Sequence, residues 1–268
     1  MKIYDCFSYL DEDLLLKLRL NILDDYVDYF VIIEGNKTWQ NNKKELKFNI
    51  DKFEQFKKKI IYIPVTDMPD GDNPYKRENF QRNAISRGTE KADKDDLIII
   101  SDLDEIPNPD KILEFSDKDK YICFVQNNYL FKFNLLNITE PFWYGTRMCR
   151  KKDLKSPQWL REIKARKLPF YKFYKPKFDR FVVNGGWHFS SVKDAEGIYK
   201  KLNCYSEQQF NNEIYKNLDF IEKKIFEKKD LFNRSYEYKV VRIDKTFPNF
   251  IFNNQETLKN LIYDEKNV

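Results

Sequence analysis

The first hundred residues alternate between β-rich apolar runs and segments with helical spacing, and this alternation constrains the fold more than any other feature of the chain. We expect four strands and three helices, with the strands at residues 2–9, 27–33, 60–65 and 97–101 and the helices at 11–25, 51–59 and 77–91. Such alternation is typical of an α/β domain with a mostly parallel sheet and helices on both faces. In these sheets, ligands bind beyond the carboxyl ends of the strands.

The fourth predicted strand ends in a cluster of carboxylates. Residues 97–107 read LIIISDLDEIP, so Asp102, Asp104 and Glu105 follow a run of buried apolar residues. In extended backbone Asp102 and Asp104 share one face while Leu103 points into the core. Two converging carboxylates repel each other unless a cation lies between them, and Mg²⁺ or Mn²⁺ prefers such oxygen ligands. The pattern therefore indicates a divalent-metal site at a strand end.

A purely structural interpretation of the same residues also exists. The acids could cap the next helix, with Pro107 or Pro109 at its first turn. In either case we expect Pro107 to stop the sheet from continuing past the acidic cluster.

The single histidine of the chain is His188, in the segment NGGWHFS at residues 184–190. One histidine excludes a multi-histidine zinc site. A neutral imidazole can complete a carboxylate metal site, although a buried histidine satisfied by hydrogen bonds is the alternative. The adjacent Gly185 and Gly186 indicate a backbone that turns sharply or that a ligand approaches closely.

Basic and aromatic residues form two further candidate groups. In the segment RENFQRN at residues 77–83, Arg77, Arg82 and Asn83 could contact a phosphate or a nucleotide, and solvated arginines on a helix surface are the alternative. The segment PFWYGTR at residues 141–147 could stack on sugar rings or bases, although aromatic residues more often belong to a core. We predict three acceptor-binding residues, Trp143 and Arg147 from this segment and Trp187 from the segment that contains His188.

Composition narrows the classes of protein that the chain can belong to. Hydrophobic residues make up 41% and aromatic residues 16%, so a folded protein is expected. The net charge of +5 arises from 48 basic and 43 acidic residues, which favours a mixed surface over a nucleic-acid-binding one. The four cysteines are scattered, and no stretch of about 18 apolar residues occurs. We therefore expect unpaired thiols and a cytoplasmic protein without a transmembrane segment.

Five segments in a fixed order resemble glycosyltransferase family 17, which includes the β-1,4-mannosyl-glycoprotein N-acetylglucosaminyltransferases. They are DCF at 5–7, DDYVDYFVIIE at 24–34, RENFQRN at 77–83, SDLDEIP at 101–107 and GWHFS at 186–190. The resemblance extends from residue 5 to about residue 235. Five ordered motifs are far more specific than any one of them.

The resemblance implies a GT-A-type fold, that is, a Rossmann-like mixed sheet flanked by helices with a helical C-terminal part. It also implies an inverting, Mn²⁺- or Mg²⁺-dependent transfer of N-acetylglucosamine from a UDP-sugar to a hydroxyl of a glycan acceptor, with a β-linkage. By this resemblance the metal ligands are Asp102, Asp104 and His188, and the donor-binding residues are Glu34, Arg77, Arg82, Asn83 and Asp102. Because the membrane anchor of the animal enzymes has no counterpart here, we do not expect a Golgi setting.

An inverting transfer also needs a carboxylate that takes the proton of the acceptor hydroxyl. Asp179 and Glu196 flank the histidine motif and are the leading candidates for this base, followed by Glu105. We expect a single domain over residues 1–268. It comprises a nucleotide-binding half at 1–110, a half at 111–235 that completes the acceptor and metal sites, and a C-terminal extension at 236–268.

Two other functions are compatible with parts of the pattern. A sugar-1-phosphate nucleotidyltransferase also binds a nucleotide and a metal, but such enzymes usually open with a glycine-rich phosphate loop, and the first glycine here is Gly35. A non-catalytic sugar- or nucleic-acid-binding module could use the aromatic residues for stacking and the lysines as a basic surface. However, the lysines at 57–59 and 223–229 are typical of solvated helix faces.

Overall fold

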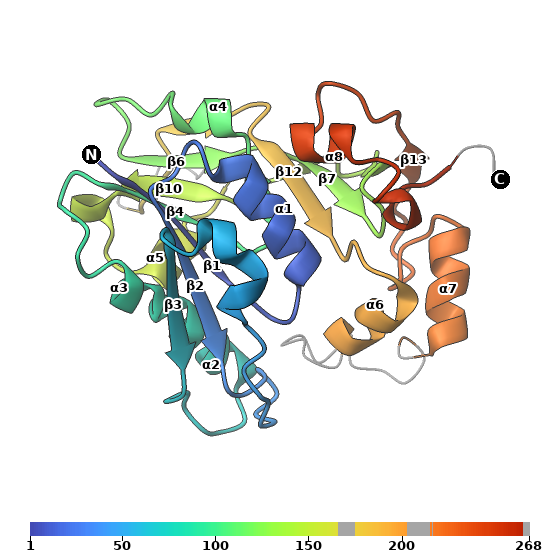
Figure 1. The fold of residues 1–268 in the computed structure, drawn as a ribbon, viewed down its shortest axis with the longest axis horizontal. Coiled ribbons are helices and arrows are strands. Elements are labelled where there is room, and N and C mark those ends of the chain that lie inside the picture. The colour runs from blue at the N-terminus through green and yellow to red at the C-terminus, as the bar shows by residue number, and fades with distance from the viewer. Residues whose placement is uncertain (166–174, 203–214, 216, 265–268) are drawn as a thin grey trace.

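The structure is a computed structural model that describes residues 1–165, 175–202, 215 and 217–264. Two sheets lie side by side, and helices cover both faces of the larger one (Figure 1). No helix in the described part of the chain is long and apolar enough to cross a membrane.

The larger sheet has seven strands in the order β11-β6-β10-β4-β1-β2-β3. The four predicted strands are adjacent and parallel in it; they are β1 (Ile3–Ser8), β2 (Tyr29–Gly35), β3 (Ile60–Val65) and β4 (Leu97–Ile100). The sheet continues through β10 (Arg147–Arg150), antiparallel to β4, then β6 (Tyr121–Phe124) and β11 (Arg180–Val182). The sheet is therefore mixed, because β10 runs against both of its neighbours.

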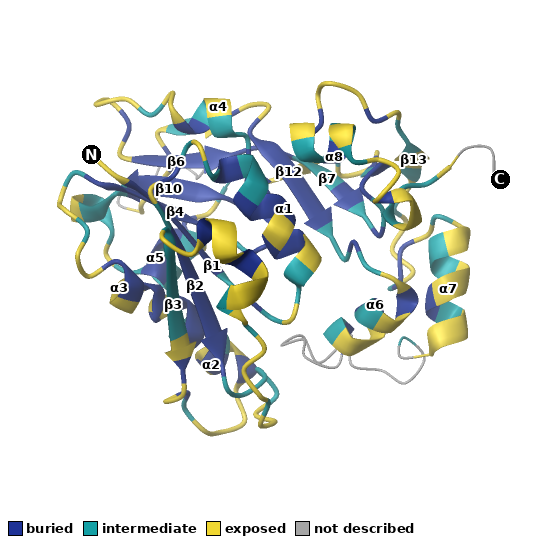
Figure 2. Ribbon diagram, in the orientation of Figure 1, coloured by how far each residue is buried: buried dark blue, intermediate teal, exposed yellow. Residues whose placement is uncertain are grey.

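The two faces of this sheet have separate hydrophobic cores. On one face, α1 (Asp13–Leu23) and the 3₁₀ helix η1 (Ile50–Phe56) pack on alternate strand residues such as Phe30 and Ile32. On the other face, the helices pack on Val31 and Ile33; they are α2 (Pro74–Asn83), α3 (Ile85–Gly88) and α5 (Pro157–Glu162). β1, β2 and β4 are buried from both sides (Figure 2), which explains why they read as continuous apolar runs, whereas the edge strand β3 is only partly buried.

The smaller sheet carries the second half of the chain. Its order is β13-β8-β7-β12-β5, from β13 (Tyr238–Val240), β8 (Leu135–Asn137), β7 (Gln126–Leu130), β12 (Gly186–Ser190) and β5 (Glu105–Pro107). A sixth short strand, β9 (Phe142–Trp143), pairs with β7. The chain passes directly from β4 of the larger sheet to β5 of the smaller one, so the acidic cluster lies at the junction of the two sheets.

The remaining helices of the described residues are α6 (Ala195–Leu202), α7 (Leu218–Phe226) and four shorter ones. A third hydrophobic cluster joins α6 and α7 through Ile198 and Ile221. The other short helices are α4 (Pro109–Ile112), η2 (Lys151–Asp153), α8 (Asn249–Asn253) and η6 (Lys259–Leu261). The expected helical C-terminal part is present in α6 and α7, whereas residues 203–214 lie outside the described residues.

The segment after β4 corrects two predictions. The backbone at Asp102 is not extended, because the amide of Glu105 donates to the carbonyl of Asp102 at 3.0 Å and closes a turn. Pro107 does not end the sheet structure either, because it belongs to β5 and pairs with Gly186. Proline is tolerated there since β5 is an edge strand. Leu103 is buried, as predicted.

Local signals explain the other differences from the sequence prediction. The helix expected at 77–91 begins earlier, because Asn73 caps α2 by accepting from the amide of Tyr75 at 3.0 Å. The fold class is confirmed as a mixed sheet flanked by helices with a helical C-terminal part. The three described cysteines, Cys6, Cys123 and Cys149, are free, and burial raises the pKa of each thiol. Cys204 lies outside the described residues.

Candidate active site

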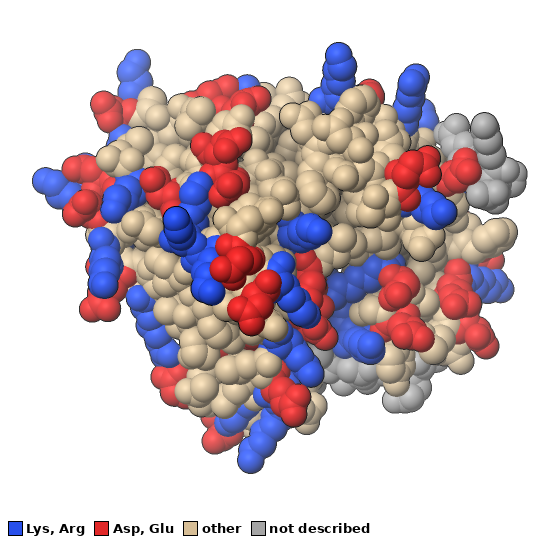
Figure 3. Space-filling model, in the orientation of Figure 1, with Lys and Arg blue, Asp and Glu red and all other residues tan. Residues whose placement is uncertain are grey.

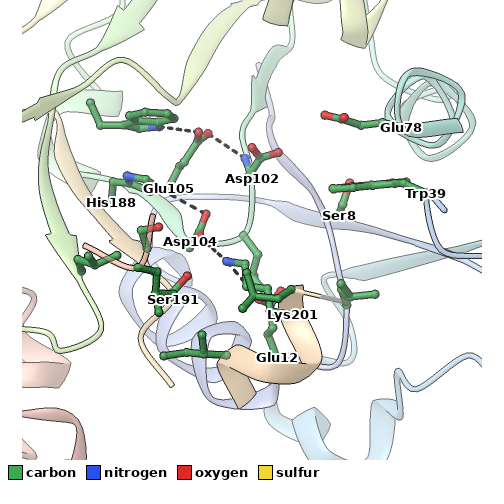
Figure 4. Close-up of a pocket in the computed structure, with 18 of the residues that line it drawn as sticks. Ser8, Glu12, Trp39, Glu78, Asp102, Asp104, Glu105, His188, Ser191 and Lys201 are labelled. Carbon is green, nitrogen blue, oxygen red and sulfur yellow. Dashed lines mark hydrogen bonds and ion pairs between the residues drawn. The ribbon is translucent and has the colours of Figure 1, made fainter. Parts of the chain in front are cut away.

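A cavity of about 560 Å³, here called the central cavity, opens at the carboxyl ends of β1, β2 and β4. Ser8 ends β1 at this cavity, Trp39 comes after β2, and Asp102 comes after β4 (Figure 4). The opposite wall comes from the smaller sheet and α6, through His188 and Lys201. The cavity therefore lies where an α/β sheet ordinarily binds its ligand.

Asp104 lies near two side chains of this cavity, Lys201 and His188. Its carboxylate lies 3.2 Å from Nζ of Lys201 and 3.8 Å from Nε2 of His188. Lys201 also lies 4.0 Å from Glu12. Burial alone raises the pKa of Asp104, but the ammonium group of Lys201 outweighs it and holds this pKa below its usual value. Asp104 is therefore ionised at neutral pH.

His188 is held in one orientation by its neighbours. Its Nδ1 lies 3.1 Å from the amide oxygen of Asn128, so Nδ1 carries the proton and Nε2 presents a lone pair towards Asp104. Its ring stacks on Trp143, with 4.5 Å between the ring centroids. Burial lowers the pKa of His188, which keeps the imidazole neutral. A neutral imidazole with one nitrogen fixed by an amide is a suitable metal ligand.

Glu105 is a buried carboxylate that connects several residues of the site by hydrogen bonds. It is 1% exposed and accepts hydrogen bonds from Nε1 of Trp143 at 2.7 Å, the amide of Asp102 at 2.9 Å and both terminal nitrogens of Arg161 at 2.7 and 3.0 Å. A Cβ at Gly145 would lie 2.4 Å from the carboxyl carbon, so only glycine fits there. Glu105 thus ties the acidic turn to the aromatic segment.

The carboxylate of Asp102 pairs with two arginines, whereas that of Asp104 lies near Lys201 and His188. Arg161 approaches its carboxylate at 2.9 Å and Arg82 at 3.2 Å, and together they hold the pKa of Asp102 well below its usual range although burial opposes them. Arg82 and Arg161 also line a second cavity of about 720 Å³, here called the side cavity. Arg147 lines it as well, at the start of β10.

Comparisons with known proteins identify the family of the chain. The model of glycosyltransferase family 17 matches residues 1–246. The chain belongs to glycosyltransferase family 17. It is 28% identical over 222 residues to the β-1,4-mannosyl-glycoprotein 4-β-N-acetylglucosaminyltransferases of Homo sapiens, Rattus norvegicus and Mus musculus, an alignment that covers 70% of this chain and 40% of each relative. The chain thus spans about 40% of the length of these curated relatives.

Solved structures resemble this family 17 chain only weakly. A glycosyltransferase involved in the glycosylation of the major capsid of PBCV-1 has a TM-score of 0.32 and 12% identity, covering 68% of this chain and 81% of that one. A putative glucose-1-phosphate thymidylyltransferase from Bacillus anthracis has a TM-score of 0.36 and 11% identity, covering 68% and 85%. Likenesses of this size support no conclusion about the chain.

Three predicted donor-binding residues of this family 17 chain do not line either cavity. The carboxylate of Glu34 is fully buried and accepts four hydrogen bonds, including one from Lys44 at 2.8 Å. Arg77 is also buried and donates to the carbonyls of Trp39 and Gly71. Asn83 accepts from the amide of Gln158 at 3.0 Å. All three hold loops and helices in place, so we leave them out of the proposed donor site.

The first two base candidates and one aromatic residue also lie apart from the cavities. Asp179 is exposed and accepts from the amides of Lys120 and Tyr121 at 3.0 and 2.9 Å. Glu196 is exposed on α6. Trp187 is buried in the core and donates from Nε1 to the carbonyl of Thr246 at 3.2 Å. The third base candidate, Glu105, lines the central cavity, but its oxygens are already occupied.

The paired glycines have a structural explanation. Gly186 has a φ of +127°, and a Cβ there would lie 2.2 Å from the carbonyl oxygen of Ile106. A Cβ at Gly185 would lie 2.7 Å from the amide nitrogen of Val125. Of the two interpretations from sequence, the sharp turn with close backbone packing is the one observed, and it sets His188 in register opposite Glu105.

The side chains near Asp104 offer few ligands for a divalent metal ion. No group of three or more His, Cys, Asp or Glu side chains in a metal-binding arrangement occurs in the described part of the chain. Asp104 and His188 nevertheless fit such an ion, because an ionised oxygen and an imidazole nitrogen with a free lone pair face each other at 3.8 Å. Asp102 is held by two arginines instead. Substrate oxygens and water would complete the shell.

Several residues of the site escaped the sequence analysis. They are Arg161, Lys201, Glu12 and Glu140, which line one or both cavities. The position of Arg161 has a local signal, because Ser156 caps α5 by accepting from the amide of Trp159 at 3.2 Å and Pro157 follows it. That signal predicts the helix but not the residue's partners.

Proposed function

We propose that the chain transfers N-acetylglucosamine from UDP-N-acetylglucosamine to a hydroxyl of a glycan acceptor, forming a β-linkage with inversion. One observation carries the proposal. Asp102 and Asp104 leave the carboxyl end of β4 into the same cavity as the chain's one histidine, and both β1 and β2 end at that cavity. The sugar and the linkage come from the names of the curated relatives. Family membership supports the enzyme class.

The nucleotide would occupy the part of the central cavity between the ends of β1 and β2. Trp39 offers an indole face and Ser8 a hydroxyl there, while Asn79 of α2 lines the same part. The departing diphosphate would then lie near Asp104 and Lys201. A Mg²⁺ or Mn²⁺ ion held by Asp104 and His188 would neutralise the charge that builds on it. Lys201 places a further positive charge at the same point.

We propose Glu140 as the base that takes the proton of the acceptor hydroxyl. Glu140 lines both cavities and is exposed, and within the described residues its carboxylate accepts one hydrogen bond, from the hydroxyl of Tyr236 at 2.9 Å. Glu78 and Asp102 also line both cavities, but both pair with Arg82. A base must keep an oxygen available to the acceptor, and Glu140 is the carboxylate among these three that meets this condition.

The charge distribution favours this proposal over a nucleic-acid-binding module. Figure 3 shows basic and acidic side chains of the described residues interspersed over the visible face, without a continuous basic stripe there. Sugar-nucleotide transfer needs a local cationic site instead, and the two cavities provide one.

Calorimetry with UDP and Mn²⁺ tests the proposal. We expect UDP to bind the wild-type chain more tightly with Mn²⁺ than after chelation, and Asp104→Asn to remove that difference. Slow hydrolysis of UDP-N-acetylglucosamine without acceptor should follow the same pattern. UDP binding that ignores Mn²⁺ in the wild type would contradict the metal site. Production of a UDP-sugar from UTP and a sugar 1-phosphate would instead establish the nucleotidyltransferase.

A further inference from the structure

Three guanidinium groups line the side cavity, but only two of them have acidic partners. Arg82 pairs with Glu78 and Asp102, and Arg161 pairs with Asp102 and Glu105. Within the described residues the guanidinium of Arg147 makes no hydrogen bond or ion pair. Its recorded contact is the ring of Phe178, 5.7 Å from its central carbon.

Arg147 is also buried, with 8% of its surface exposed, and its Nε has no hydrogen-bond partner. A buried cation without a partner is costly to a fold. Burial and repulsion from Arg161 lower the pKa of Arg147 to about 10, although Glu105 and Asp102 offset part of this effect. The cavity beside Arg147 gives space for an anion that would supply the missing partner.

The position of Arg147 separates it from the nucleotide part of the central cavity. In the larger sheet, β10 and β1 lie on opposite sides of β4. The nucleotide part lies towards β1 and β2, whereas Arg147 begins β10, and Asp102 lies between them and lines both cavities. An anion at Arg147 is therefore on the acceptor side of the reaction.

The remaining wall of the side cavity suits a sugar ring. Phe142, Trp143 and Tyr144 line it and are 55%, 39% and 41% exposed. Exposed aromatic faces of this kind pack against the C–H faces of sugars. Beside them, the planar guanidinium of Arg147 matches the two oxygens of a carboxylate or phosphate.

We propose that the side cavity binds an acceptor that carries an anionic group, a carboxylate or a phosphate on a sugar, and that Arg147 pairs with this group. The inference rests on the proposed function, because it assumes that the central cavity holds the donor. It narrows the acceptor from any glycan to an acidic one.

Binding of simple sugars by calorimetry tests the inference. The probes are methyl β-D-glucuronide, glucose 6-phosphate and the neutral methyl β-D-glucoside. We expect the wild-type chain to bind at least one of the acidic probes and to bind the neutral one more weakly. Arg147→Gln should weaken acidic binding by about tenfold or more, because a charge-assisted bidentate pair is lost. UDP affinity in the presence of Mn²⁺ should not change.

Arg150→Gln is the matched control. Arg150 lies at the other end of β10 and also stacks on a phenylalanine, Phe115, at 4.9 Å, but it pairs with Asp117 at 2.7 Å and does not line the side cavity. This variant should bind the acidic probes like the wild type. Arg147→Lys keeps the charge without the planar fork, so it should retain part of the affinity, and it serves if Arg147→Gln does not fold.

Two results would overturn the inference. Equal binding of the acidic and neutral probes would show that the side cavity does not recognise an anionic group. Weaker UDP binding in Arg147→Gln would assign the anion to the donor diphosphate instead. Failure of the proposed function looks different, because the wild-type chain would then bind the acidic sugar but not UDP.

Discussion

The central cavity and the side cavity meet at Asp102, yet their charges are organised in opposite ways. In the central cavity, each carboxylate of the acidic turn already has a cationic partner, Lys201 for Asp104 and the two arginines for Asp102. In the side cavity, a cation, Arg147, lacks an acidic partner among the described residues. The first arrangement suits exchange of one cation for another, and the second suits capture of an anion. One acidic turn thus separates two sites of different chemistry.

Glu140→Gln should have the largest effect, because Glu140 lines both cavities. We expect the transfer rate constant to fall by roughly 10²–10⁴-fold, the usual contribution of a general base. UDP binding should be unchanged, since the amide alters neither the nucleotide part nor Asp104. Steady-state kinetics with the acceptor measures the transfer rate constant, and calorimetry measures UDP binding. Transfer at the wild-type rate would exclude Glu140 as the base.

Asp104→Asn should impair metal-dependent transfer at the central cavity and leave ligand binding in the side cavity unchanged. We expect Mn²⁺-dependent transfer to fall by about 10²–10³-fold, the scale on which charge stabilisation at a developing anion acts. Binding of glucuronide should stay within about twofold of the wild type, because Asp104 does not line the side cavity. Asp95→Asn is a control, since Asp95 forms an exposed pair with Lys152. Loss of glucuronide binding in Asp104→Asn would show that the cavities are not independent.

Glu105→Gln should disturb both cavities through the fold. It leaves Arg161 without its buried partner, and breaking a buried ion pair costs about 3–5 kcal/mol. Because Arg161 keeps Asp102, we expect the lower end of that range, roughly 3 kcal/mol, as a loss in the free energy of unfolding. Urea denaturation measures it. The exposed Glu45→Gln should change stability by less than about 0.5 kcal/mol, and equal effects of the two variants would contradict the role given to Glu105.

Asn128→Ala should have the smallest effect of the four variants, a weaker affinity of the central cavity for the metal ion. Asn128 touches His188 but not Asp104, so its loss frees the imidazole to turn. Metal affinity should fall by about tenfold, the lower end for a residue that orients a ligand. Titration of Mn²⁺ in the presence of UDP measures this affinity. Unchanged affinity would remove His188 from the proposed ligand set.

The sequence predicted best what depends on neighbouring residues. The strands β1, β2 and β4 were readable because each is a short run buried on both faces, and β3 was readable as a short apolar run although it is only partly buried. Asp102 and Asp104 were identified as the residues that follow such a buried run. Glu34 ends a similar run, but its carboxylate turns towards Lys44 and nearby amides. A strand end alone does not say which carboxylate reaches a cavity.

The residues that the sequence missed owe their positions to distant parts of the chain. Lys201 lies 97 residues beyond Asp104, and Arg161 lies 56 residues beyond Glu105. Both come from helices that look like ordinary charged surface helices when read alone. Their roles depend on how the two sheets pack against each other, and the spacing of apolar residues within one helix does not predict that packing.

The short connection between the two sheets has a mechanical consequence. Four residues, Ser101 to Asp104, separate the last parallel strand of the larger sheet from the edge strand of the smaller one. Any sliding of one sheet against the other must pass through this link, and Arg19 braces it by donating to the carbonyls of Asp102, Leu103 and Glu105. A ligand that bridges the carboxylates would stiffen the link further. Substrate binding and resistance to pulling the sheets apart should therefore rise together.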